Sequence, residues 1–118
     1  MEDFVDHCQR GDLGDVRGAV GRGVDVNSVY SDGLSGLMWA VRNSHNQVVE
    51  WLLQQRGIDV SRRDRLGQTA LHWAVYGDNP TLLSLLLAHP TADPTLRENG
   101  GRTPLEFCRW GTGRQGET

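Results

Sequence analysis

A 34-residue period is the feature that most constrains this chain. The segment from Gly67 to Ala74 has one counterpart 34 residues earlier and another 34 residues later, beginning at Gly33 and Gly101. A period of this length is typical of proteins that stack one small supersecondary unit many times. Because each unit packs only on its neighbours, the 118 residues need no single large core. The period therefore predicts a solenoid.

Each repeated segment opens with a glycine, and a serine or threonine stands two residues after it. Ser35, Thr69 and Thr103 precede apolar runs, and each can cap a helix by accepting a hydrogen bond from an amide of the first turn. The glycine two residues earlier is the residue type that most easily takes positive φ in a tight turn. Each unit thus reads as a turn, a cap and a short helix, which predicts an all-α fold.

These units resemble the ankyrin repeat, whose inner helix opens with Gly-x-Thr-Pro-Leu-His-x-Ala. The matching residues are Gly67, Thr69, Leu71, His72 and Ala74, with Ala70 where the family prefers Pro. The resemblance implies an all-α ankyrin-repeat solenoid of helix–turn–helix units with hairpin-like connecting loops.

The resemblance also implies that His72 makes structural hydrogen bonds to the backbone near the hairpins. Met38 and Glu106 stand at the corresponding positions of the neighbouring units. We therefore expect this network to be broken in those two units.

The period predicts a single domain over residues 1–110. Its units are expected at about 1–32, 33–66 and 67–100, with a partial unit at 101–110. Residues 111–118 read Gly-Thr-Gly-Arg-Gln-Gly-Glu-Thr, which cannot form the outer helix that should follow, so a flexible tail is expected there. The last inner helix, with Leu105 and Phe107, then lacks its cover. A chain cut from a longer protein and a natural frayed end both fit this pattern.

The charge pattern gives no sign of a nucleic-acid or membrane surface. Net charge is −3, and no run of like charges is long enough to form such a surface. No apolar stretch reaches the length of a membrane span, and the chain starts with acidic residues where a signal peptide would be basic. We therefore expect no nucleic-acid or membrane partner and a cytoplasmic location, with the nucleus as a second compartment.

The two cysteines are expected to be reduced. If Cys8 and Cys108 lie on the inner helices of the first and fourth units, three helix spacings of about 8–10 Å separate them. A disulfide needs Cα atoms within about 7 Å.

No motif points to catalysis, a cofactor or a metal. The chain has neither Gly-x-Ser-x-Gly nor His-Glu-x-x-His, and no Gly-rich loop follows a strand. All 12 basic residues are Arg, so every Lys-based mechanism is excluded. The four His and two Cys show none of the paired spacings of a zinc site. We predict that the protein is not an enzyme.

The resemblance implies a partner-binding surface on a concave groove formed by the inner helices and hairpin tips. Carried over position by position, the predicted contact residues are Asp32, Leu34, Arg42, Asn43, Arg65, Leu66, Gln68, Tyr76, Arg102 and Trp110. Arg, Tyr and Trp dominate the energetics of interfaces. The expected partner is another protein with an acidic segment and apolar anchors. Ordinary solvated side chains at these positions are the alternative interpretation.

Three aromatic residues recur at the repeat period: Trp39, Trp73 and Phe107. They are expected to stack as a ladder within the domain. Two interpretations stay open, namely core packing and partial exposure of one ring as an anchor for a ligand.

The loop Asp25-Val26-Asn27 resembles the ankyrin segment that a cytosolic asparaginyl hydroxylase modifies. The resemblance implies hydroxylation of Asn27, although Ala19 replaces the Leu of that pattern.

Taken together, the sequence predicts a non-catalytic protein-binding module, monomeric on its own. The alternative is a structural or oligomerising segment of a longer ankyrin-repeat protein that uses the uncovered fourth unit.

Overall fold

The computed structural model describes residues 4–29 and 33–106, and these ranges contain six helices. They are α1 (Phe4–Arg10), α2 (Leu13–Gly21), α3 (Gly36–Arg42), α4 (Asn46–Leu53), α5 (Ala70–Tyr76) and α6 (Pro80–Leu87). Residues 104–106 are also helical. The described residues form no strand, and the one bridge pairs Val29 with Ser35. The all-α prediction is confirmed.

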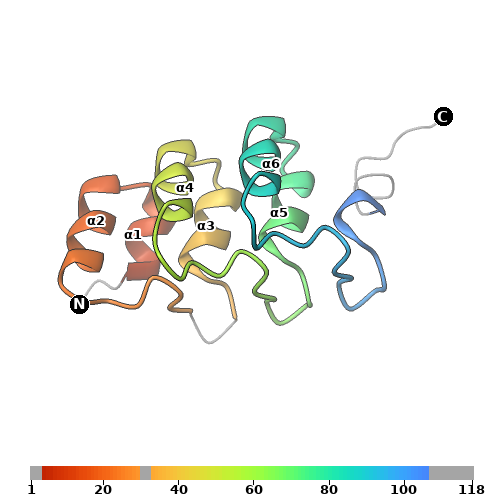
Figure 1. Cartoon of the computed structure of the whole chain (residues 1–118), viewed down its shortest axis with the longest axis horizontal. Helices are drawn as coiled ribbons and strands as arrows, with labels where there is room; N and C mark the ends of the chain where they lie inside the picture. The colour runs from red at the N-terminus through yellow and green to blue at the C-terminus, as the bar shows by residue number, and fades with distance from the viewer. Residues whose placement is uncertain (1–3, 30–32, 107–118) are drawn as a thin grey trace.

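Three helix pairs stack side by side along the longest axis of the molecule (Figure 1). The inner row consists of α1, α3 and α5, which pack in that order, and the outer row consists of α2, α4 and α6. Long connections project from one end of the helix pairs and join each unit to the next (Figure 1). The expected solenoid of helix–turn–helix units is therefore confirmed. None of the described helices has the length and apolar character needed to cross a membrane.

Local capping explains where the helices begin. Ser35 Oγ accepts a hydrogen bond from the Met38 amide at 3.2 Å. Asn79 Oδ1 accepts one from the Leu82 amide at 3.1 Å, and Pro80 occupies the first helical position, where no N–H is needed. The three motif glycines all take the expected positive φ: 84° at Gly33, 78° at Gly67 and 87° at Gly101.

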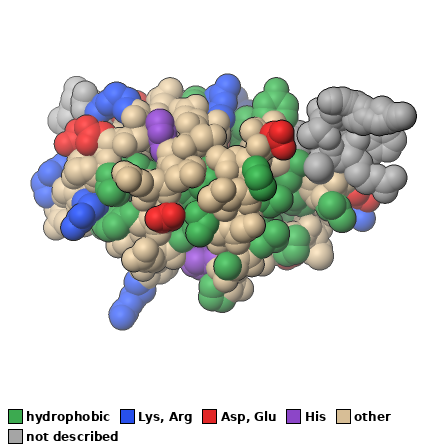
Figure 2. Space-filling model, turned by 90° about the horizontal axis from the view of Figure 1, so that it is seen from above, with side chains coloured by type: hydrophobic (Ala, Val, Ile, Leu, Met, Phe, Trp, Pro, Cys, Tyr) green, Lys and Arg blue, Asp and Glu red, His purple; other side chains and the backbone are tan. Residues whose placement is uncertain are grey.

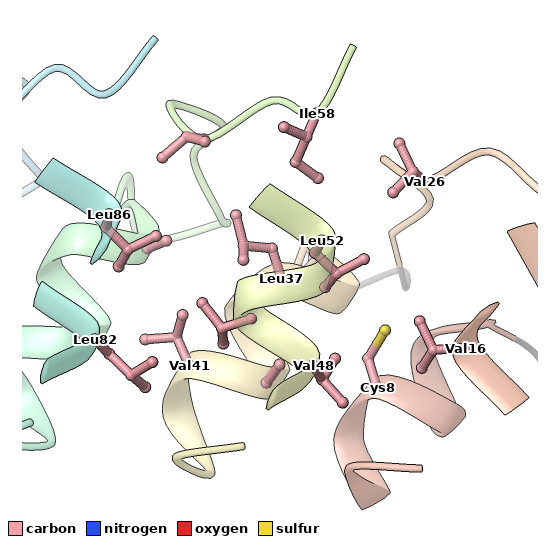
Figure 3. Packing of buried hydrophobic residues seen from close by; sticks show 14 of the residues in the cluster. Cys8, Val16, Val26, Leu37, Val41, Val48, Leu52, Ile58, Leu82 and Leu86 are labelled. Atoms are coloured by element: carbon pink, nitrogen blue, oxygen red, sulfur yellow. The ribbon is translucent and has the colours of Figure 1, made fainter. Parts of the chain in front are cut away.

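The core runs continuously between the two rows of helices (Figure 3). Leu52 and Val48 of α4 lie between Val16 of α2 and Leu82 of α6 in this layer. Closer approach is possible between α1 and α3 because Gly36 has no side chain. An added Cβ at that glycine would lie 2.7 Å from Cys8 Sγ, and Cys8 is a buried free thiol.

Hydrogen bonds between loops tie each unit to the next. Asn27 Nδ2 donates to the carbonyl oxygen of Gly57 at 2.8 Å, and Asn27 Oδ1 accepts from the Asp59 amide at 2.8 Å. One unit further on, Ser61 Oγ donates to the Thr91 carbonyl at 2.6 Å. The units are thus joined by polar contacts at the loops as well as by the core.

The fourth unit is capped by Thr103, as expected, and also by Glu106. The Thr103 amide donates to Glu106 Oε1 at 3.0 Å, and the Glu106 amide donates to Thr103 Oγ1 at 3.3 Å. This reciprocal pair is a capping box. The expectation that replacing His with Glu106 breaks the network was therefore wrong for the cap, because a carboxylate accepts the same amide.

Only some of the predictions for residues 101–118 fall on residues that the structure describes. Leu105 is 74% exposed, in agreement with an uncovered inner helix. Phe107, Cys108, Trp110 and the tail at 111–118 lie outside the described residues, as does Asp32.

Candidate functional site

An arginine and three aromatic rings from two neighbouring units meet on the inner row of helices. The Arg42 guanidinium carbon lies 4.9 Å from the ring centroid of Trp39 and 5.4 Å from that of Trp73. Tyr76 packs edge-on against Trp73, with centroids 6.1 Å apart and planes at 87°. We call these four residues the aromatic–arginine cluster. Both distances from the guanidinium lie within the range of cation–π attraction.

Exposure within the cluster differs from one residue to the next. Trp39 and Trp73 are half-buried, whereas Arg42 is exposed and Tyr76 is 64% exposed. Each ring packs against the core and presents a face to Arg42, in agreement with core packing, whereas the use of one ring as an anchor for a ligand stays a prediction. A stacked guanidinium keeps its N–H groups in the plane, where they can fork onto a carboxylate. In the described part of the chain, no carboxylate forms an ion pair with Arg42.

Asp64 organises the hairpin tip beside the cluster. Its Oδ1 accepts hydrogen bonds from the amides of Leu66 and Gln68, both at 2.9 Å. Its Oδ2 accepts from Trp73 Nε1 at 3.1 Å. Asp64 is only 8% exposed, so a buried carboxylate is satisfied by three N–H donors.

Glu98 has the same role in the next tip. Its Oε1 accepts from the Arg102 amide at 2.9 Å, and its Oε2 accepts from Arg102 Nη2 at 3.1 Å. These hydrogen bonds lower the pKa of Glu98, with the Arg102 side chain as the largest cause. Arg102 was predicted to offer its charge to a partner, but its guanidinium is already paired with Glu98.

The tips carry three more of the predicted contact residues. Leu66 is 58% exposed, and its carbonyl accepts from the Asn99 amide at 2.8 Å. Arg65 is exposed, and its carbonyl accepts from Asn99 Nδ2 at 3.1 Å. Gln68 is half-buried, and its carbonyl accepts from the Asp64 amide at 2.9 Å. Neighbouring tips are therefore held in register by their backbones, while the side chain of Leu66 stays exposed.

The remaining predicted residues are less closely grouped. Asn43 is exposed, and its side chain donates to the Gln9 carbonyl at 3.0 Å, which links α3 to the first unit. Leu34 is half-buried. Asp32 and Trp110 lie outside the described residues.

His72 is structural, as the resemblance implied. It is fully buried, its Nδ1 accepts from the Thr69 amide at 3.1 Å, and its Nε2 donates to the Arg102 carbonyl at 2.9 Å. Burial lowers the pKa of His72, and the Arg102 hydrogen bond opposes this effect less strongly. The imidazole is therefore held neutral.

Sequence reasoning missed Asp64 and Glu98, although a signal for them exists. Both stand three residues before a motif glycine, so aligning the two hairpins would have revealed an acid at one fixed place.

Two open hollows lie on the other side of the stack, near the ends of α4 and α6. Their volumes are about 480 and 350 Å³, and they meet at His89. The first is lined by loop residues including Asn27, and the second by Leu53 and Leu85. Throughout the residues that the structure describes, no group of three His, Cys, Asp or Glu side chains could hold a metal ion.

Comparison with known proteins supports the same architecture. A family model described as ankyrin repeats matches residues 5–98 in three copies. No curated protein matches the chain.

Proposed function

Because the chain belongs to the ankyrin repeat family, whose members are generally protein–protein interaction modules, we propose that it is a non-catalytic module that binds a partner protein. The binding surface is the concave side, formed by the inner helices and the hairpin tips. A cytoplasmic location, with the nucleus as a second compartment, stays a prediction from the sequence.

The aromatic–arginine cluster is the observation that carries the proposal. It presents a cation without a described carboxylate partner, and Trp73 links this cation to the exposed ring of Tyr76. Leu66, on the hairpin tip that Asp64 organises, adds a second exposed apolar side chain. Arg and Tyr are among the residues whose truncation costs interfaces the most. The stacking of Arg42 on two rings also limits the side-chain entropy that binding would remove. A preorganised charged anchor therefore lies next to apolar surface.

The chemistry of this surface favours a partner segment that is acidic and carries apolar anchors. A carboxylate complements Arg42, and an aromatic or aliphatic side chain complements the exposed parts of Tyr76 and Leu66. Arg102 contributes less to this attraction because Glu98 neutralises it.

Affinity purification with matched variants tests the proposal. The wild-type chain, Arg42→Glu and Arg17→Glu are used as baits after circular dichroism has shown that all three fold. Arg17 is exposed on α2, in the outer row, so its reversal changes net charge equally without altering the cluster. A partner retained by the wild type and Arg17→Glu but lost with Arg42→Glu is the expected result. The same proteins on all three baits would contradict the proposal.

An oligomerising role through the fourth unit is the second candidate. Leu105 is 74% exposed there. Hydrophobic side chains also gather over the middle and C-terminal part of the face seen in Figure 2, whereas charged side chains are more frequent toward the N-terminal end. Light scattering after size exclusion separates the candidates. A monomer is expected for the binding module, whereas a dimer that Leu105→Glu dissociates would favour the second role.

A further inference from the structure

The hairpin tips that lead into the third and fourth units each carry one carboxylate at the same place in the repeat. Asp64 and Glu98 are 34 residues apart, and both are buried. Asp64 accepts from the Trp73 indole N–H, and Glu98 pairs with the Arg102 guanidinium. In both cases an acid at the tip therefore satisfies a donor that belongs to the unit that follows.

The tip that leads into the second unit has no acid at this place in the sequence. The residue 34 positions before Asp64 is Tyr30, which has no carboxylate. Yet Trp39 stands where Trp73 stands in the next unit. The Nε1 atom of Trp39 is shielded from solvent, and no acceptor lies within hydrogen-bond distance of it in the part of the chain that the structure describes. A buried donor left without an acceptor is destabilising, because the lost hydration of its N–H group is not replaced.

A second donor group lies beside this indole. The Arg42 guanidinium carbon is 4.9 Å from the Trp39 ring centroid, and no described carboxylate pairs with it. One carboxylate can accept from several N–H groups at once, as Asp64 does from three. Trp39 Nε1 and the Arg42 guanidinium can therefore share one carboxylate acceptor, as three N–H donors share Asp64.

We infer that an aspartate or glutamate side chain of the bound partner takes, in the second unit, the role that Asp64 has in the third. It accepts hydrogen bonds from Trp39 Nε1 and from the guanidinium of Arg42. This inference rests on the proposed function and narrows it. The partner's acid is one side chain at a fixed place, not a general excess of negative charge.

Access to the indole N–H requires a side-chain movement at the surface, since the atom is shielded in the unbound chain. Arg42 is exposed and lies over the same ring, so its guanidinium is accessible to an entering carboxylate. The entering carboxylate then accepts hydrogen bonds from two N–H donors. Such charge-assisted hydrogen bonds are roughly twice as strong as neutral ones.

A random linear peptide library displayed on phage provides the probe. Selection is carried out on the whole chain, and peptides are kept if Arg42→Gln or Tyr76→Ala weakens them while Arg17→Gln does not. We expect these peptides to share one Asp or Glu next to an apolar residue. Changing that acid to its amide should weaken binding about 10- to 100-fold, the equivalent of one charge-assisted hydrogen bond.

The indole resonances of ¹⁵N-labelled protein then locate the acid, with Trp39→Phe used to assign the Trp39 signal. Peptide binding should move the Trp39 indole proton downfield and leave that of Trp73 in place, because Trp73 is already bonded to Asp64.

The outcomes separate this inference from the proposed function. Peptides that depend on Arg42 or Tyr76 but carry no shared acid, or that leave the Trp39 indole unmoved, would overturn the inference and leave the binding module standing. If selection yields no peptide that depends on the cluster, the proposed function fails together with the inference.

Discussion

The Nε2 atom of His72 lies 2.9 Å from the carbonyl oxygen of Arg102, so a buried side chain of the third unit is hydrogen-bonded to the backbone of the fourth. The same imidazole accepts from the Thr69 amide at 3.1 Å through Nδ1. Only the neutral ring can donate on one side and accept on the other. The protonation state of one residue is thus linked to the contact between two units.

Stability should fall as pH decreases through the ordinary pKa of histidine. Burial holds the pKa of folded His72 below 6.5, so the unfolded chain binds its proton first. The contribution of His72 is therefore complete above about pH 6.5 and is lost progressively as pH falls toward the lower folded pKa. Urea midpoints measured between pH 8 and pH 5 check this.

The His72→Gln variant serves as the control for that series. It should lose about 1–3 kcal/mol at pH 7.5, because a buried hydrogen-bonded group is disturbed. Its stability should also change less than that of the wild type between pH 7 and pH 5. The lowered pKa values of Glu98 and Glu106 affect stability in a different pH range, below the ordinary glutamate pKa of 4.5. Parallel curves for the two proteins would contradict the role assigned to His72.

Adding one methyl group at Gly36 should destabilise the chain by about 1–3 kcal/mol. Its Cβ would lie 2.7 Å from Cys8 Sγ and 2.9 Å from Phe4 Cε2, which forces α1 away from α3. Gly21→Ala is the matched change, since a Cβ there meets nothing within 4 Å and alanine favours helix by up to about 1 kcal/mol. Urea denaturation should give opposite signs for the two variants.

Ser44→Gly should stabilise the turn between α3 and α4 by up to about 1 kcal/mol. Ser44 has φ of 59°, a conformation that costs a residue with a Cβ but not glycine. Gln47→Gly, at an exposed position inside α4, should instead cost about 1 kcal/mol. A loss of stability with Ser44→Gly, measured by thermal unfolding, would show that the turn is not strained.

Asn27→Ala should cost about 1–2 kcal/mol, because the carboxamide makes two hydrogen bonds, to Gly57 and Asp59. Ser61→Ala removes one such bond, to Thr91, and should cost less. Chemical denaturation compares the two variants directly.

Hydroxylation of Asn27 stays a prediction. Mass spectrometry of the peptide that contains Asn27, after exposure to an asparaginyl hydroxylase, tests it. An unshifted peptide mass would contradict the prediction that Asn27 is hydroxylated.

Much of the fold could be predicted from the sequence because each repeat is specified by residues that lie close together in the chain. The glycines with positive φ, the caps at Ser35 and Asn79, and the apolar faces of the helices all depend on residues within one turn of each other. Such short-range rules act before any tertiary contact is known. The order of the six described helices followed from them.

The site was harder to predict because its chemistry depends on contacts between positions far apart. The pairing of Arg102 with Glu98 depends on the path of the hairpin, and the position of Arg42 over Trp73 depends on how closely α3 and α5 pack. Judged by residue type alone, Arg42, Arg65 and Arg102 are equivalent candidates for binding a partner. The structure instead gives Arg42 a role that Arg102 does not share.

The position of Arg42 has one more consequence. Its guanidinium lies over Trp39 from the second unit and over Trp73 from the third, so this side chain contributes to the angle at which the two units meet. A ligand that draws Arg42 toward itself would therefore also change a contact that the two units share. We expect ligand affinity and the packing of α3 against α5 to be linked for this reason.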